Sequence, residues 1–157
     1  MEKNAKEKAY DRLARHCAKM ETCTEDARRK LQKTELSEGE RQEIIERLQR
    51  EGFIDDGRYA RAFATDKVRF ARWGRMKIRM ALRGKGIGDD LIENALGRIE
   101  GEDYKEALGV LLEPRLKESG KELEWTEYAK LMRFAQGRGF EHDVVEMWLD
   151  EAGYRGV

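Results

Sequence analysis

Apolar positions recur along the chain at spacings of three and four residues, which is the period of an amphipathic helix. Near the start, the apolar residues Ala9, Leu13, Cys17 and Met20 fall on one face of a helix predicted over about 5–20. One proline in 157 residues, few β-branched runs and abundant Glu, Lys, Arg, Ala and Leu also favour helix. The pattern therefore predicts an all-α protein.

Two further helices are expected before the first clear glycine stop. Both begin with the Ser/Thr-x-x-Glu spacing of a capping box, and the pairs are Thr22–Glu25 and Ser37–Glu40. The first of these helices is short and ends near residue 33. The second buries a stripe made by Ile44, Ile45 and Leu48, and it ends at Gly52 because glycine adopts the left-handed C-cap conformation readily.

The middle of the chain predicts another set of three helices. The first begins at a capping Asp55 or Asp56 and reaches Arg72. The break "WG" precedes a short helix over about 75–83, and "GKGIG" precedes a third over about 89–99. That third helix is expected to bury four apolar residues, Leu91, Ile92, Ala95 and Leu96.

The last part repeats this organisation. A helix begins near Tyr104, is interrupted at Pro114, and helical pattern resumes in "WTEYAKLMRFAQ". After the turn "GRG", a final helix is expected in "EHDVVEMWLDEAG".

An internal repeat supports three equivalent units. The stretch 82–96 aligns with 135–149 at a constant offset, which pairs Gly86 with Gly139 and Ile87 with Phe140. A period of about 50 residues predicts tandem repeats, each with too small a core to stand alone. We expect an elongated, curved rod of three-helix units, with boundaries at 1–56, 57–100 and 101–157.

Composition narrows the class of protein further. Charged residues make up 41% of the chain, which leaves a thin core, and no apolar run reaches the length of a membrane span. The charged start "MEKNAKEKAY" is unlike a secretory signal, and two cysteines are too few for a disulfide framework. We expect a reduced, cytoplasmic, monomeric protein that does not bind membranes.

The formal net charge of zero conceals three unequal regions. Residues 1–56 carry 13 Lys+Arg and 14 Asp+Glu, and residues 57–88 carry 10 and one. Residues 100–151 carry seven Lys+Arg and 14 Asp+Glu. A basic middle beside an acidic last third predicts an anionic partner, although the acidic third could also neutralise the basic face.

The basic residues of the middle form two predicted stripes. On the helix 57–72, an arc of about 80° holds Arg58, Arg61, Arg69 and Arg72, opposite a face that buries Tyr59, Phe63 and Phe70. On the next helix, Arg75, Arg79 and Arg83 are four residues apart, so their charges repel. An external anion, or acids from another unit, would relieve that repulsion.

Other chemistry is weakly indicated. Asp55 and Asp56 are more typical of a helix cap than of a catalytic pair, and Trp73 at the helix break is more typical of a packing anchor. Cys17, Cys23 and two distant histidines do not make a zinc site, and "RGKGIG" lacks the spacing of a phosphate-binding loop. The sequence predicts no catalytic residues, no metal and no cofactor.

Two motifs resemble the RecX family of regulatory proteins. The first is "GFIDDGRYA" at 52–60. The second has the spacing Gly-x-x-x-Ile-x-x-x-Leu-x-x-Lys-Gly-Ile and comprises Gly74, Ile78, Leu82, Lys85, Gly86 and Ile87. The motifs support the resemblance over residues 6–100, and the repeat extends it to 153. Gly57 replaces the usual glutamate, and "CTEDARRKL" departs from the first repeat's usual pattern.

The resemblance implies a non-enzymatic inhibitor of the RecA recombinase. Members of this family bind along the groove of the RecA filament on single-stranded DNA and lower its ATPase and strand exchange. Weak binding to naked DNA is also expected. The residues expected to contact this partner are Arg58, Arg61, Arg69, Arg72, Arg75, Arg79, Arg83 and Lys85. The alternatives are a stand-alone nucleic-acid-binding module, and a scaffold whose basic middle docks on its own acidic end or on another copy.

Overall fold

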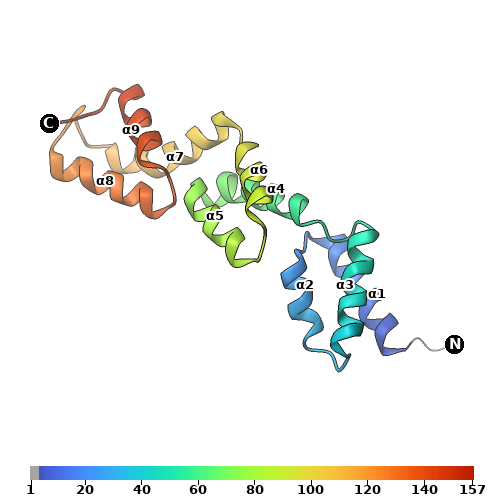
Figure 1. The fold of residues 1–157 in the computed structure, drawn as a ribbon. Coiled ribbons are helices and arrows are strands. Elements are labelled where there is room, and N and C mark those ends of the chain that lie inside the picture. The colour runs from blue at the N-terminus through green and yellow to red at the C-terminus, as the bar shows by residue number, and fades with distance from the viewer. Residues whose placement is uncertain (1–3) are drawn as a thin grey trace.

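The computed structural model describes residues 4–157 as an elongated stack of helices with the two termini at opposite ends (Figure 1). The first unit comprises α1 (Ala5–Lys19), α2 (Thr24–Leu31) and α3 (Glu38–Arg50). The second comprises α4 (Asp56–Asp66), a π-helical turn η1 (Lys67–Ala71), α5 (Arg75–Gly84) and α6 (Asp89–Gly97). The third comprises α7 (Gly101–Leu116), α8 (Trp125–Gly137) and α9 (His142–Glu151). The expected all-α rod of helical repeats is confirmed.

A two-stranded parallel pair closes the third unit. Strand β1 (Glu122–Leu123) precedes α8, and strand β2 (Arg155–Gly156) follows α9. Leu123 in this pair is fully buried, so the pairing ties the end of the chain to the core. Among the described residues, no helix is long and apolar enough to cross a membrane.

The first unit has a hydrophobic core of its own. Its buried residues come from all three helices and the segment after α3, and they are Tyr10, Leu13, Ala27, Leu31, Leu36, Ile44, Ile45, Leu48 and Ile54. Ser37 and Glu40 form the predicted capping box at the start of α3. Gly52 has a positive φ of 79°, as expected of the residue that ends this helix.

The predicted capping box at Thr22 and Glu25 is wrong. α2 begins at Thr24, and the buried Thr22 hydroxyl donates instead to the carbonyl of Met20 (3.2 Å). The side chain of Asp56, from the start of α4, accepts a hydrogen bond from the Thr24 amide (2.8 Å). A residue of the next unit therefore supplies the cap that the local sequence does not.

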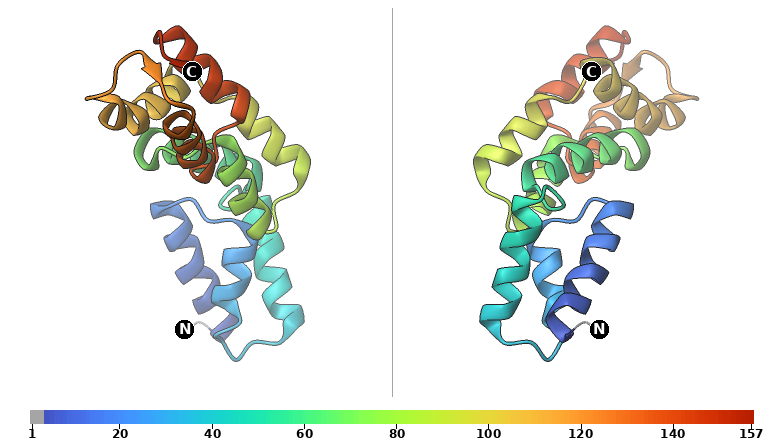
Figure 2. Two further views of the ribbon diagram at one scale, coloured as in Figure 1. Left: turned by 90° about the vertical axis from the view of Figure 1, so that its left-hand side faces the viewer. Right: turned by 90° about the vertical axis from the view of Figure 1, so that its right-hand side faces the viewer.

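The second and third units share one core. A single cluster of buried residues runs from Ala60 in α4 to Leu149 in α9, and it also includes Cys23 from the first unit. Figure 2 shows the consequence: α1, α2 and α3 form a distinct bundle at one end, while the remaining helices interleave at the other.

Two local predictions fail within this shared core. α7 continues through Pro114, although proline removes one backbone hydrogen bond. Leu112 and Leu116 are buried on either side of it, so packing on the core holds the helix together. Leu91 is 41% exposed and not buried, because α6 turns Ile92, Ala95 and Leu96 toward the core instead.

Glycines allow the second and third units to approach at backbone distance. The amides of Gly74 and Met76 donate to the carbonyls of Arg138 and Gly139 (2.8 and 2.9 Å). A Cβ atom at Gly74 would lie well inside 3.0 Å of the Gly139 backbone. Gly86 and Gly139, paired by the repeat, both have positive φ (74° and 96°). The repeat therefore pairs two glycines whose backbone conformation disfavours other residues, and Gly139 in addition leaves no room for a Cβ atom.

Candidate nucleoprotein-binding surface

The expected straight row of arginines on the first basic helix does not form. α4 ends at Asp66 and continues as the π-helical turn η1, and Arg72 then adopts a left-handed conformation with φ 58°. A π turn holds more residues than an α turn, so side chains beyond it rotate out of the α-helical register. Phe70, expected in the core, is 79% exposed as a result.

Acidic side chains neutralise most of the predicted contact residues. In the second unit, Arg79 bonds Glu93 (2.7 Å) and Arg83 bonds Asp89 (3.1 Å), both on α6. The hydrogen bond from Arg79 lowers the pKa of Glu93, and the same bond raises the pKa of Arg79. The repulsion expected along α5 is therefore relieved within the molecule.

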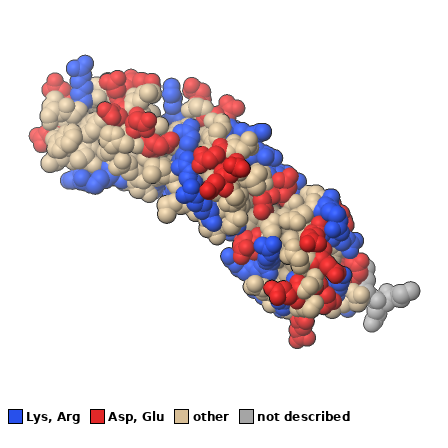
Figure 3. Space-filling view, viewed as in Figure 1, with Lys and Arg blue, Asp and Glu red and all other residues tan. Residues whose placement is uncertain are grey.

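Other predicted contact residues join neighbouring units. Arg69 bonds Asp103 of α7 (2.9 Å), and Arg58 bonds Glu21 just after α1 (2.6 Å). Two more ion pairs cross between units, Arg75–Glu141 and Lys85–Asp26. Figure 3 accordingly shows basic and acidic side chains intermixed over the face that it presents.

Arg75 is part of the joint between the second and third units. Its guanidinium pairs with Glu141 (2.9 Å) and lies 4.0 Å from the ring centroid of Tyr104. The Arg75 amide donates to the Tyr104 hydroxyl (2.9 Å), which in turn donates to Glu141. Burial, followed by the bond to Glu141, raises the pKa of Tyr104. Arg75 therefore has a structural role that its sequence position does not reveal.

Arg61 and Arg72 form no ion pair within residues 4–157. Lys67 and Lys77, which were not among the predicted contact residues, also form no ion pair within this range. The ammonium groups of Lys67 and Lys77 each lie 4.6 Å from the centroid of the Trp73 ring. These cations remain available to an external anion.

Half-buried aromatic rings extend from Trp73 along α4. Phe63 meets the Trp73 ring edge-on (centroids 6.2 Å apart), and Tyr59 stacks on Phe63 (5.9 Å, 28°). We call Phe63, Lys67, Trp73 and Lys77 the Trp73 cluster. Trp73 was expected to be a packing anchor, but the sequence did not predict that two lysines would flank its ring.

Two exposed methionines also lie on the surface of the second unit. Met76 and Met80 lie one turn apart on α5 and are 50% and 73% exposed. Flexible, polarizable methionine side chains suit contact with a protein surface. Their i, i+4 spacing on the otherwise polar side of α5 is a signal that could have identified them from the sequence.

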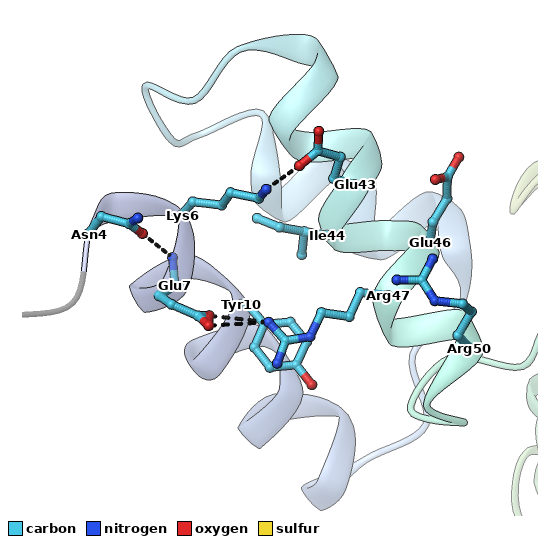
Figure 4. A pocket seen from close by; sticks show the side chains of 9 residues that line it. All are labelled: Asn4, Lys6, Glu7, Tyr10, Glu43, Ile44, Glu46, Arg47 and Arg50. Atoms are coloured by element: carbon cyan, nitrogen blue, oxygen red, sulfur yellow. Dashed lines mark hydrogen bonds and ion pairs between the residues drawn. The ribbon is translucent and has the colours of Figure 1, made fainter.

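The hollows of the first unit differ in charge. In the hollow between α1 and α3 (Figure 4), ion pairs balance the charges of the lining. Lys6 pairs with Glu43, and Arg47 pairs with Glu7 (3.2 Å) and stacks over the Tyr10 ring. Between α1 and α2, a hollow of about 310 Å³ contains no carboxylate. Arg12, Lys30 and Lys33 are its basic lining residues, and His16 lies among them.

No group of histidine, cysteine or carboxylate side chains within residues 4–157 is placed to hold a metal ion. Burial raises the pKa of the Cys17 and Cys23 thiols, so neither is an activated nucleophile. The described surface therefore offers charged, aromatic and thioether groups for binding.

These features define a class: an all-α tandem-repeat protein whose units present different charged surfaces. Comparisons with known proteins identify it. The model of the RecX second three-helix domain matches residues 55–96, and that of the RecX third three-helix domain matches 102–149. The chain belongs to the RecX family. The third unit thus has direct support, beyond the internal repeat.

Individual relatives agree with the family models. The chain is similar to "Regulatory protein RecX" of Prosthecochloris aestuarii (30% identical over 146 residues, 92% of this chain and 93% of that protein). It is 34% identical over 116 residues to a protein of that name from Thermus thermophilus, covering 72% of this chain and 71% of the relative.

Solved structures show the same architecture. A crystal structure of a regulatory protein RecX is 27% identical, with a TM-score of 0.77 over 92% of this chain and 71% of that one. RecX from Lactobacillus salivarius matches in fold, with a TM-score of 0.82, 21% identity, and coverage of 93% and 95%.

Proposed function

We propose that this protein is a non-enzymatic inhibitor of the RecA recombinase that binds the RecA filament on single-stranded DNA. By occupying the filament it limits ATP hydrolysis and strand exchange during DNA repair and recombination in the cytoplasm. The observation that carries the proposal is membership of a family whose relatives are named regulatory proteins. A rod of tandem repeats also supports it, because an elongated surface spans neighbouring subunits of a filament.

The middle unit supplies the proposed contact. Of the eight basic residues selected from the sequence, Arg61 and Arg72 remain without an ion pair in the described chain, and the Trp73 cluster adds Lys67 and Lys77. Arginine and lysine beside aromatic rings suit a nucleic-acid backbone. Arg58, Arg69, Arg79, Arg83 and Lys85 contribute only if a partner replaces their carboxylates.

The test is single-stranded-DNA-dependent ATP hydrolysis by the cognate RecA, with this protein added well below the recombinase concentration. We expect inhibition by the wild type and a loss of about tenfold in potency for Lys67→Gln/Lys77→Gln. The matched control is Arg115→Gln/Arg138→Gln, which also removes two cations from around one ring, that of Phe134 (3.5 and 5.1 Å). Equal losses in the two variants would show that the middle unit has no special role.

The alternative is a nucleic-acid-binding module without a recombinase partner, which the lysines flanking Trp73 also favour. It predicts firm binding to naked single-stranded DNA that weakens steeply with salt. Absence of any effect on the ATPase, together with such binding, would replace the inhibitor by this module. Arg75 is left intact in both assays, since changing it would disturb the joint between units.

A further inference from the structure

The third unit carries a second uncovered surface at the end of the rod. Two large apolar side chains are exposed there, Trp125 at the start of α8 (68%) and Met147 on α9 (60%). They border a hollow of about 710 Å³ between α8, α9 and β2. Trp125 stacks on Tyr128, with ring centroids 6.0 Å apart and planes inclined by 9°. We call this hollow and its lining the Trp125 hollow.

Its composition is that of a protein-binding surface. Tryptophan, tyrosine and methionine are enriched at the centres of protein interfaces, where they account for much of the binding energy. An exposed tryptophan held by stacking loses little conformational freedom on binding. Val157 is also 68% exposed, and its amide donates to the carbonyl of Leu123, two residues before Trp125.

Charge selects the kind of partner. Asp143, Glu146 and Asp150 line the hollow from α9, and the only Lys or Arg side chain in the lining is Arg155. None of these carboxylates pairs with a lysine or arginine within residues 4–157, although Glu146 lies 3.5 Å from His142. Burial raises the pKa of Tyr128, and the charges of Glu146 and Asp150 raise it further, which places both carboxylates near the stacked rings. Phosphates would be repelled here.

We propose that the Trp125 hollow docks a protein segment that combines lysine or arginine with an apolar anchor. The anchor packs against Trp125 and Met147, and the cations meet the carboxylates of α9. In this arrangement, the middle unit contacts the nucleic acid and the third unit contacts protein. Taking a recombinase subunit as the source of that segment rests on the proposed function, whereas the docking chemistry does not.

The docking chemistry is tested first, without recombinase. The probe is a synthetic peptide of alternating lysine and leucine, and the signal is the Trp125 indole resonance, assigned with Trp125→Phe. We expect a saturable shift that Glu146→Gln/Asp150→Asn weakens about tenfold, while Glu102→Gln/Glu106→Gln on α7 leaves it unchanged. No shift, or equal shifts with a glutamate–leucine peptide or a single-stranded oligonucleotide, would overturn the proposal.

The recombinase arm separates the two proposals. If the wild type inhibits the ATPase, Trp125→Ala should raise its half-maximal concentration about tenfold, and Val110→Ala, at another exposed apolar position, should not. Inhibition that is unaffected by Trp125→Ala would refute recombinase docking while leaving the inhibitor function intact. No inhibition by the wild type would refute the proposed inhibitor function. The peptide titration would still test whether the Trp125 hollow docks a cationic, apolar segment.

Discussion

The first and second units meet mainly through polar groups, with Cys23 of the first unit reaching the neighbouring core, whereas the second and third units share one extensive core and backbone hydrogen bonds. At the first junction, Asp56 caps α2 and Lys85 pairs with Asp26. At the second, the turn around Gly139 lies against the start of α5, and the guanidinium of Arg75 lies 4.0 Å from the centroid of the Tyr104 ring. Polar contacts near solvent are individually weak, while a packed core resists separation. Repeats that are alike in sequence are therefore joined with very different strength.

Gly74→Ala should break the second junction and have the largest effect. The new methyl group would overlap the Gly139 backbone, and we expect a loss of about 3 kcal/mol in the free energy of unfolding. The matched control is Gly88→Ala, since Gly88 also caps a helix in an extended conformation but has no atom near its Cβ position. Chemical denaturation of both variants measures the difference, and similar midpoints would contradict close docking.

Tyr104→Phe should weaken the same junction by about 2 kcal/mol. The change leaves the Arg75 amide and Glu141 without their shared hydroxyl partner in a partly buried place. Tyr59→Phe is the control, because the Tyr59 hydroxyl makes no hydrogen bond within residues 4–157. The same denaturation experiment applies, and an equal cost at the two tyrosines would argue against the bonded network.

Asp56→Ala should loosen the first junction by about 1 kcal/mol, the usual cost of a lost helix cap. Asp56→Asn keeps an acceptor oxygen for the Thr24 amide and should cost less. Amide hydrogen exchange measures the effect locally, with faster exchange expected in α2 and no change in α9. Faster exchange in both helices would show that the two junctions are coupled.

Lys85→Met should have the smallest effect, about 0.5 kcal/mol, and added salt should reduce it. The hydrogen bond to Asp26 raises the pKa of Lys85 above its ordinary value of 10.5. A raised folded pKa gives stabilisation that is complete below the ordinary value and is lost as pH rises through the folded value. The difference between wild type and variant should therefore stay constant from about pH 7 to about 9. A difference that grew over this range would contradict the pairing.

Local rules succeeded where a residue's own neighbours decide its conformation. The capping box at Ser37, the Asp55 cap of α4 and the positive φ at Gly52 were all predictable, because each depends on a few adjacent residues. The repeat likewise paired Ile87 with Phe140, and the structure buries both.

The basic surface was only partly predictable. Helical spacing correctly showed that Arg75, Arg79 and Arg83 follow one face, but it could not show that acids distant in sequence pair with them. A single π-helical turn displaced Phe70 and separated residues that a continuous helix would align. Lys67 and Lys77 gather at Trp73 only because the chain bends between them.

The sequence alone determined the helices, the repeat and the class of protein, since periodicity, caps and glycine positions are properties of short segments. Only the tertiary structure decided which units share a core and which cations stay unpaired. Tertiary packing also explains why α7 continues past Pro114, because burial of Leu112 and Leu116 outweighs the loss of one backbone hydrogen bond. Ion pairs and packing join residues that are far apart along the chain, and no local pattern records those distances.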